Sequence, residues 1–111
     1  MSDVYYNPED HGLEIVGEIS FDDDSYQFEM GVVWWHPERR AFFYATDSGC
    51  SCPSPFEDYL SVDDLGEPLD LSKLTARLRA LKLPDYVGSP PAPLPVQVQP
   101  IIDRARELVQ P

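Results

Sequence analysis

The stretch that decides the fold runs from Tyr26 to Phe56 and reads YQFEMGVVWWHPERRAFFYATDSGCSCPSPF. It holds both tryptophans, both cysteines and four of the five phenylalanines of the chain. Its first part alternates as a strand does, with one set of side chains on each face. The two sets are Tyr26, Phe28, Met30, Val32 and Trp34, and Gln27, Glu29, Gly31, Val33 and Trp35. Both sets become apolar near Trp35, which indicates cover on both faces or an exposed patch.

The rest of the sheet is predicted on either side of this strand. His36 to Arg40 forms a hairpin turn, because proline fixes one backbone angle and cannot extend a ladder. Ala41 to Thr46 is rich in aromatic residues and predicts a further strand. Upstream, apolar residues alternate with mostly polar ones and predict a first strand with one buried face: Leu13, Ile15, Ile19 and Phe21. Gly17 within it indicates a bulge or a close neighbour. Short sequential connections then give an antiparallel meander.

Helical signals follow the cysteines. Ser54 and Glu57 match a capping box that predicts a short helix over 55–60. Asp70 is an expected N-cap for an amphipathic helix ended by Pro84, with its apolar stripe at Leu71, Leu74, Leu78 and Leu81. We therefore predict an α+β fold, a three-stranded antiparallel meander packed by one or two helices.

The composition changes after this helix. Six of the residues 84–100 are proline, which predicts an extended linker. Ile101 to Val109 predicts a short C-terminal helix that docks on the domain or waits for a partner. The expected organisation is an α+β domain over 1–83, a proline-rich linker over 84–100 and a short helix within 101–111.

Charge is distributed unevenly along the chain. The net charge is −12, and residues 1–70 carry 17 acidic but only 2 basic side chains, whereas residues 71–111 carry 3 acidic and 6 basic ones. An acidic field repels phosphate, so we expect no direct nucleic-acid binding. The acidic residues either suit a basic partner surface or simply keep a small protein soluble. The sequence also lacks the long apolar run of a membrane span and the features of a signal peptide, so we expect a cytoplasmic protein.

The motif DSGCSCP, residues 47–53, holds both cysteines and is the strongest candidate for a reactive or metal-binding site. Cys50 and Cys52 could ligate a soft metal, form a strained disulfide or act as a redox pair; reduced, partly buried thiols are the ordinary alternative. A zinc site shared with His11 and His36 conflicts with the meander, which places His36 and Cys50 at opposite rims roughly 25 Å apart. The same separation argues against a Cys50 nucleophile with a histidine base. No cofactor is expected.

Two features suggest protein contacts instead. The run Asp22, Asp23 and Asp24 reads as a solvated turn rather than a cation loop. Because Trp34 and Trp35 point to opposite faces, at least one is expected to be exposed, and a tryptophan beside Arg39 would be a good anchor. The predicted partner-binding residues are Asp22, Asp23, Asp24, Trp35 and Arg39.

The aromatic hairpin and the string DSGCSCPSPFE, Asp47 to Glu57, resemble small uncharacterised proteins encoded by phages of actinobacteria. The resemblance covers about a third of the chain and implies a phage accessory gene expressed inside a bacterium, without implying any activity.

Three hypotheses about function follow. The first is a non-enzymatic acidic protein that binds a host or phage protein, with inhibition by nucleic-acid mimicry as a narrower form of this hypothesis. The second is a thiol or metal protein centred on Cys50 and Cys52. The third is a phage assembly subunit that self-associates through its C-terminal segment.

Overall fold

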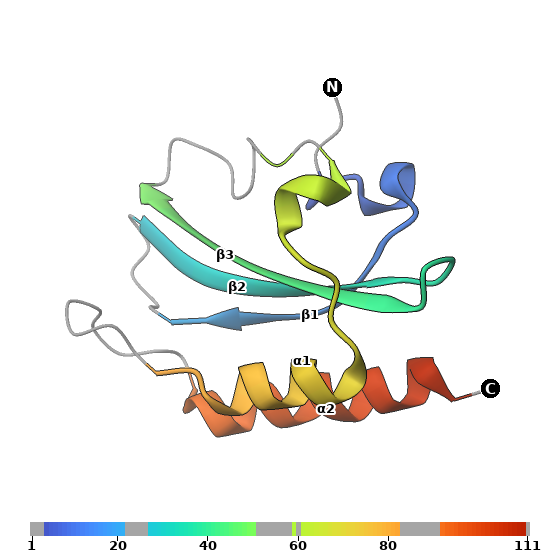
Figure 1. Cartoon of the computed structure of the whole chain (residues 1–111). Coiled ribbons are helices and arrows are strands. Elements are labelled where there is room, and N and C mark those ends of the chain that lie inside the picture. The colour runs from blue at the N-terminus through green and yellow to red at the C-terminus, as the bar shows by residue number, and fades with distance from the viewer. Residues whose placement is uncertain (1–3, 22–26, 51–58, 60, 83–91, 111) are drawn as a thin grey trace.

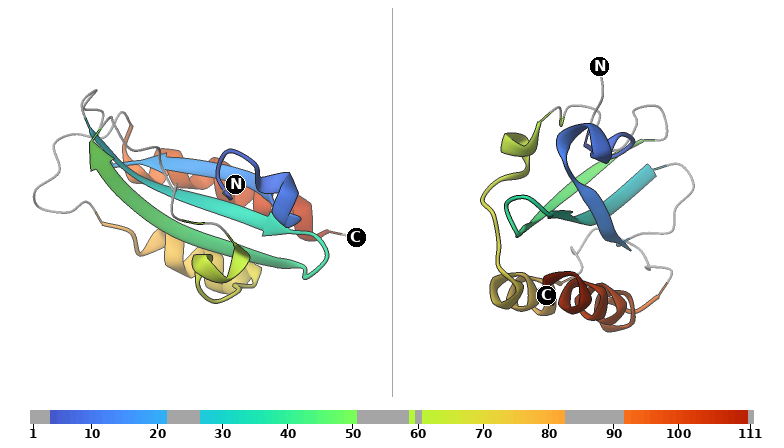
Figure 2. Two further views of the ribbon diagram at one scale, coloured as in Figure 1. Left: turned by 90° about the horizontal axis from the view of Figure 1, so that it is seen from above. Right: turned by 90° about the vertical axis from the view of Figure 1, so that its right-hand side faces the viewer.

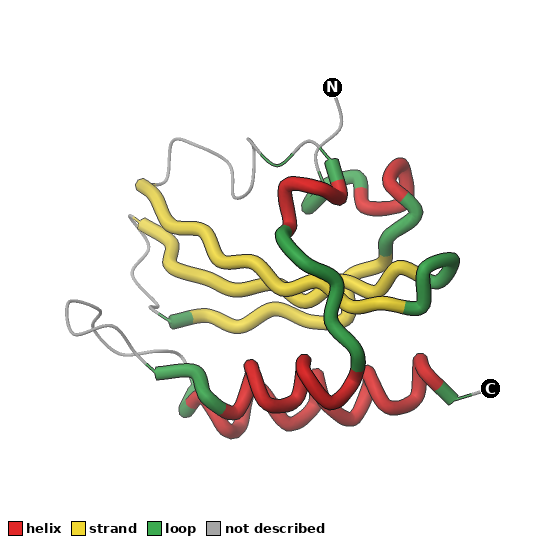
Figure 3. Tube along the Cα trace, viewed as in Figure 1, coloured by secondary structure: helices red, strands yellow, loops and turns green. Residues whose placement is uncertain are grey.

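The computed structural model describes residues 4–21, 27–50, 59, 61–82 and 92–110. Its strands β1 (Glu14–Ser20), β2 (Gln27–His36) and β3 (Ala41–Cys50) form one antiparallel sheet in the order β1-β2-β3. Helices α1 (Leu71–Arg79) and α2 (Leu94–Val109) lie side by side across one face of the sheet (Figures 1 and 2). The short 3₁₀ helices η1 (Pro8–His11) and η2 (Val62–Leu65) lie on the other side (Figure 3). The predicted α+β meander is confirmed.

The β2–β3 hairpin has the turn that the sequence predicts. Pairing runs from His36 opposite Ala41 at the turn to Gln27 opposite Cys50 at the far end. β3 is therefore four residues longer than the predicted strand, which ended at Thr46. Residues 37–40 make the turn, and Arg40 adopts a positive φ of 50°. Its guanidinium donates a 2.8 Å hydrogen bond to the carbonyl of Val109 at the end of α2. This bond satisfies a carbonyl that has no partner within the helix.

Apolar side chains are buried on both faces of the sheet. Trp35 and Phe42 belong to the core between the sheet and the helices, with ring centroids 4.5 Å apart. Trp34 and Phe43 belong to a second core, under η2 and the N-terminal residues. Trp34 and Trp35 are 0% and 3% exposed, respectively. Of the two alternatives left open by the sequence, cover on both faces is confirmed.

A bulge divides β1 between these two cores. Gly17 pairs with Val33 and Ile15 with Trp34, so the register shifts between Ile15 and Gly17 as the sequence predicted. Because an extra residue inverts the alternation of side chains, Ile15 packs in the second core whereas Ile19 packs under the helices. The expectation of one buried face for all of β1 was therefore wrong.

Helix α1 begins where its sequence signals predict, but it ends at Arg79, before the predicted stop at Pro84. The Asp70 carboxylate accepts a 2.7 Å hydrogen bond from the backbone N–H of Lys73, which confirms the predicted N-cap. Leu74 and Leu78 are buried, and Leu71 and Leu81 pack against the same core. The predicted leucine stripe therefore faces the sheet. The helix predicted over 55–60 lies almost wholly outside the described residues.

Helix α2 begins at Leu94, seven residues before the predicted start, and continues through Pro100. A proline inside a helix costs about 3 kcal/mol, but Pro100 is exposed and the opposite face of the helix is buried. The buried residues recur at helical spacing and are Val98, Ile101, Ile102 and Ala105. Burial in the core thus outweighs the local preference of prolines for extended backbone.

The Gln97 side chain fastens the start of α2 to the edge of the sheet. Its Oε1 accepts a 2.7 Å hydrogen bond from the N–H of Ser20, and its Nε2 donates to the Ser20 carbonyl at 2.9 Å. The amide thus pairs with β1 as a neighbouring strand would. Nε2 also donates to the carbonyl of Ala92 at 2.7 Å. Residues 92–100, which the sequence assigned to a linker, are in this way part of the packed structure.

Tyr44 contributes a buried hydroxyl to the core under the helices. Its Oη has no hydrogen-bond partner among the described residues. Gly31 makes the space for it, since a Cβ at that position would lie 2.5 Å from Oη. Burial raises the pKa of Tyr44 to about 12, although the guanidinium of Arg77, 5.7 Å from the ring centroid, acts to lower it.

Replacing Tyr44 with phenylalanine should make stability less sensitive to alkaline pH. The unfolded phenol ionises near its ordinary pKa of 10.0, whereas the folded one remains neutral until about 12. The free energy of unfolding of the wild type should thus fall between these pH values, by about 2–3 kcal/mol through this residue. Y44F should lack that part of the fall. At neutral pH it should be as stable as the wild type or up to about 1 kcal/mol more stable, because an unsatisfied hydroxyl is removed.

The measurement is urea denaturation of both proteins across neutral and alkaline pH. Identical losses of stability in the two proteins would contradict the role given to Tyr44.

No helix in the described parts of the chain is long and apolar enough to cross a membrane.

Candidate functional site

One surface of the molecule combines carboxylates with tyrosine side chains, one of which is exposed. We call it the acidic layer and define it as residues 4–13, 59 and 61–65 together with Glu18 of β1. It covers the face of the sheet opposite the helices (Figure 1). It contains no lysine or arginine and has five carboxylates: Glu9, Asp10, Glu18, Asp63 and Asp64. All five residues are exposed.

Backbone and indole hydrogen bonds hold this layer on the sheet. The buried Trp34 donates from Nε1 to the carbonyl of Val4 at 2.9 Å. The N–H of Val4 in turn donates to the carbonyl of Tyr59 at 3.0 Å. Val4 itself is 0% exposed. The central tryptophan therefore fixes the backbone immediately before Tyr5 and Tyr6.

Tyr5 and Tyr6 are the aromatic part of the layer. The hydroxyl of Tyr5 donates a short hydrogen bond to Oε1 of Glu18. Tyr6 packs against Tyr5 edge to face, with ring centroids 4.9 Å apart, and is itself 56% exposed. Edge-to-face contact restricts a ring at little cost, so Tyr6 presents an oriented aromatic surface to solvent.

The electrostatics of the layer favour cations over anions. Partial burial, and then the hydrogen bond to the Glu18 carboxylate, raise the pKa of Tyr5 above its ordinary value. Burial and the nearby charges of Asp47 and Asp64 raise the pKa of Tyr59 in the same direction. Both phenols are therefore held neutral among carboxylates. A lysine or arginine from a partner would find negative charge and aromatic faces together, the combination that binds such groups.

The opposite side of the sheet carries charge of the other sign. We call residues 71–82 and 92–110, which form α1, α2 and their flanks, the helix layer. Its six basic and two acidic side chains give a net charge of +4, in a chain whose net charge is −12. The charge asymmetry seen along the sequence thus becomes an asymmetry between two faces of the molecule.

Only part of the predicted contact surface lies where the sequence placed it. Trp35 is buried in the core, 3% exposed, so its expected role as an exposed anchor was wrong. It is covered by Phe42 and by the guanidinium of Arg40, which lies 5.8 Å from its ring centroid. Arg39 is exposed in the hairpin turn. The predicted residues Asp22, Asp23 and Asp24 lie outside the described residues.

The predicted separation of His36 from Cys50 is confirmed for the backbone. His36 ends β2 at the hairpin turn, and Cys50 ends β3 at the opposite end of the ladder. The ten residues from Ala41 to Cys50 span roughly 30 Å in a strand. The buried imidazole of His36 accepts a 3.2 Å hydrogen bond at Nδ1 from the N–H of Arg39, which gives it a structural role in the turn.

Metal binding by Cys50 and Cys52 stays a prediction from the sequence. Within the described ranges, no three histidine, cysteine, aspartate or glutamate side chains gather as metal ligands would. Cys52 lies outside those ranges. A site shared between Cys50 and His36 is excluded by their separation along the strands.

Sequence reasoning missed Tyr5 and Tyr6 entirely. They precede the first strand, in a segment without hydrophobic periodicity, for which the sequence predicts only an irregular lead-in. The signal that could have found them is the pairing of two adjacent aromatic residues with the acidic residues Glu9 and Asp10. Two adjacent aromatic side chains in a polar, turn-rich segment are expected either to be buried in the core or to contact another protein.

Comparison with known proteins places the chain in a family without assigning it an activity. Neither a search of curated proteins nor a search of solved structures found a match. The sequence model of one family matches residues 2–107, which includes every helix and strand described above except the last residues of α2. The chain therefore belongs to the family described as Domain of unknown function (DUF7574).

Proposed function

We propose that the chain is a non-enzymatic phage accessory protein that binds a basic surface of a host or phage protein through its acidic layer. The observation that carries this proposal is Tyr6, an aromatic ring 56% exposed on a layer that has five carboxylates and no lysine or arginine. Exposed aromatic side chains dominate the energy of many protein interfaces. Complementary charge adds specificity and speeds association.

Two properties of the acidic layer contribute to binding. The acidic layer attracts a basic surface over several ångströms, and that attraction is screened by salt. Tyr6 then contributes contact area, and its edge-to-face packing on Tyr5 reduces the entropy lost when it is immobilised. The partner class that fits is a protein with arginine or lysine around an apolar depression. The cytoplasm of the host bacterium is the proposed compartment, in line with the resemblance to phage proteins.

Inhibition by nucleic-acid mimicry is a narrower form of this proposal. A basic protein surface that normally holds phosphates would accept the carboxylates of the acidic layer in their place. This form requires that the partner bind DNA or RNA with the same surface.

The substitution Tyr6→Ser should weaken partner binding by roughly 10-fold to 30-fold, the size of effect that an exposed aromatic anchor gives. The matched control is Val96→Ser. Val96 is the other exposed large apolar residue of the described chain, 60% exposed, and lies in the helix layer. The partner is recovered from host lysate at low salt, purified and titrated against the wild type and both variants.

Three readings of this titration are informative. Raising the salt concentration should weaken binding of the wild type. If Y6S and the wild type have equal affinities for the partner, the proposal is wrong. Nucleic acid, as a duplex or a single strand, is then added to the complex. If binding depends on Tyr6 but nucleic acid does not displace this chain from its partner, the proposed binding is supported and mimicry is wrong.

A further inference from the structure

A cavity opens between the C-terminal end of α1 and the N-terminal end of α2, on the side of the sheet away from the acidic layer. Its volume is about 190 Å³. Apolar cavities of about 150 Å³ in protein cores accommodate benzene, so this one can hold an aromatic ring. Five of its seven lining residues are apolar: Leu78, Leu81, Leu94, Pro95 and Val98.

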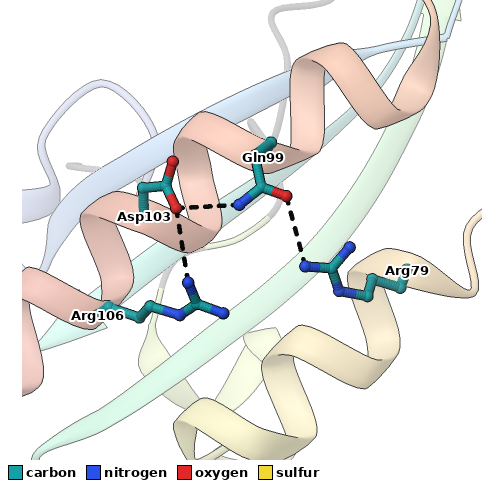
Figure 4. Close-up of polar contacts among 4 residues, drawn as sticks. All are labelled: Arg79, Gln99, Asp103 and Arg106. Atoms are coloured by element: carbon teal, nitrogen blue, oxygen red, sulfur yellow. Dashed lines mark hydrogen bonds and ion pairs between the residues drawn. The ribbon is translucent and has the colours of Figure 1, made fainter.

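The polar part of the cavity lining consists of one cation and one neutral amide, which are joined by a hydrogen bond. Arg79 and Gln99 contribute to the lining from the two helices, and both residues are exposed. Arg79 donates to Oε1 of Gln99 at 3.4 Å, and Nε2 of Gln99 donates to Asp103 at 3.0 Å (Figure 4). Asp103 in turn lies 3.8 Å from the guanidinium of Arg106. This chain of contacts links α1 to α2 and fixes Gln99, so that Arg79 stands beside an apolar depression.

The two sides of the molecule are therefore complementary to each other. The acidic layer presents the exposed ring of Tyr6 among carboxylates. The helix layer presents a cavity large enough for a ring, with Arg79 at its side and a net charge of +4 around it. The layers lie on opposite faces of the sheet, so one chain cannot join its own two surfaces (Figure 1).

We propose that copies of this chain associate head to tail, with Tyr6 of one copy in the cavity of the next and the carboxylates of the acidic layer facing Arg79. This inference rests on the acidic layer being a protein-binding surface, as proposed above, and names a second copy of the chain as one of its partners. An interface between two different surfaces leaves one surface of each kind free at the ends, so association continues beyond a dimer, into open chains or into a ring where the rotation between copies closes.

The net charge of −12 does not prevent such contact at physiological ionic strength. The Debye length is about 8 Å at 0.15 M salt, so distant charges are screened and the charges that face each other across the interface dominate. The facing charges are opposite in sign. The general repulsion between copies makes the association weak and dependent on protein concentration.

The test is sedimentation velocity at physiological salt over a wide range of protein concentration. The wild type should show a sedimentation coefficient that rises with concentration. Tyr6→Ser and Arg79→Glu should each weaken association by at least about tenfold. Lys73→Glu makes the same change of charge at the other end of α1, away from the cavity, and should weaken association much less than Arg79→Glu does. Circular dichroism confirms that each variant is folded.

Mixing the two defective variants gives the sharpest result. Y6S retains an intact cavity, and R79E retains Tyr6. Tyr6 of an R79E copy can therefore still enter the cavity of a Y6S copy, whereas the opposite pairing lacks both contacts. The mixture should form a discrete dimer, whereas each variant alone is monomeric. A wild type that is monomeric at every concentration, a mixture that does not dimerise, or association unaffected by either substitution would overturn the inference. If the chain does not self-associate but still binds another protein through Tyr6, this inference is wrong and the proposed function is unaffected.

Discussion

A chain that ends at Ala92, and so lacks α2, should fail to fold. The helix contributes three large side chains to the core under the sheet, Val98, Ile101 and Ile102, which are 4%, 5% and 0% exposed. Burial of one such side chain stabilises a protein by roughly 1.5–3 kcal/mol, so the three together contribute about 5–9 kcal/mol. This is comparable with the whole free energy of unfolding of a small domain, about 5–15 kcal/mol.

Two further losses accompany this truncation. The amide of Gln97 would no longer satisfy the N–H and carbonyl of Ser20 at the edge of β1. Buried residues of β1 and β2, such as Ile19 and Val33, would face water. The expected product is a chain with little tertiary structure, seen as collapse of NMR chemical-shift dispersion and loss of a cooperative thermal transition.

Single substitutions give a graded version of the same test. Ile102→Ala should lower the free energy of unfolding by about 2–4 kcal/mol, because it leaves a cavity in a buried position. Arg104→Ala, on the exposed side of the same helix, should change it by no more than about 0.5 kcal/mol. A truncated chain that kept a dispersed spectrum and a cooperative transition would show that α2 is an appendage, as the proline-rich composition before it suggests.

The elements that the sequence predicted well are those whose signals are local. The β2–β3 hairpin depends on alternation over neighbouring residues and on Pro37 in the turn, and its turn lies where predicted. Helix α1 depends on the Asp70 cap and a leucine stripe, both of which are local too. The acidic character of one face also follows from sequence, because all five carboxylates of the acidic layer precede residue 71.

The elements that were predicted poorly depend on contacts between distant residues. Residues 94–100 have a proline-rich composition that favours extended backbone, whereas burial of Val98 and the hydrogen bonds of the Gln97 side chain favour the helix. The exposure of Trp35 could not be judged from alternation, because its cover comes from Phe42 and Arg40 across the hairpin. Tyr6 was missed because its importance depends on the exposure of its ring, which no periodic pattern encodes.

The bulge in β1 shows the same limit most clearly. Gly17 correctly indicated a bulge or a close neighbour, and the structure has both. The consequence of the bulge, the transfer of Ile15 to the opposite core, depends on the register with β2. That register is set by pairing across the sheet and cannot be read from β1 alone.

Substituting Gly17 with alanine should destabilise the protein through a collision with α2. A Cβ at this position would lie 2.5 Å from Cγ1 and 2.9 Å from Cδ1 of Ile101. Ile101 is buried and β-branched, and its rotamer is restricted in a helix, so it cannot move aside freely. Forcing an extra methyl group into a packed core costs about 1–3 kcal/mol. The G17A variant should lose about this much stability, with α2 shifted away from β1.

A double-mutant cycle identifies the cause of that loss. Ile101→Ala removes both colliding carbons and should by itself cost about 2–4 kcal/mol through the cavity that it leaves. In the G17A/I101A protein the new methyl group enters that cavity, so the double variant should be about as stable as I101A alone. The coupling between the two positions is then favourable and about 1–3 kcal/mol in size.

Gly66→Ala provides the control for this cycle, because it introduces backbone strain without a steric collision. Gly66 has a φ of 89°, and a Cβ added there would meet nothing within 4 Å, so its substitution strains the backbone without touching α2. Its cost should be the same whether residue 101 is isoleucine or alanine. All variants are compared by urea denaturation at one pH. If the losses of G17A and I101A simply add, the two side chains do not meet, and the packing of α2 on the bulge is wrong.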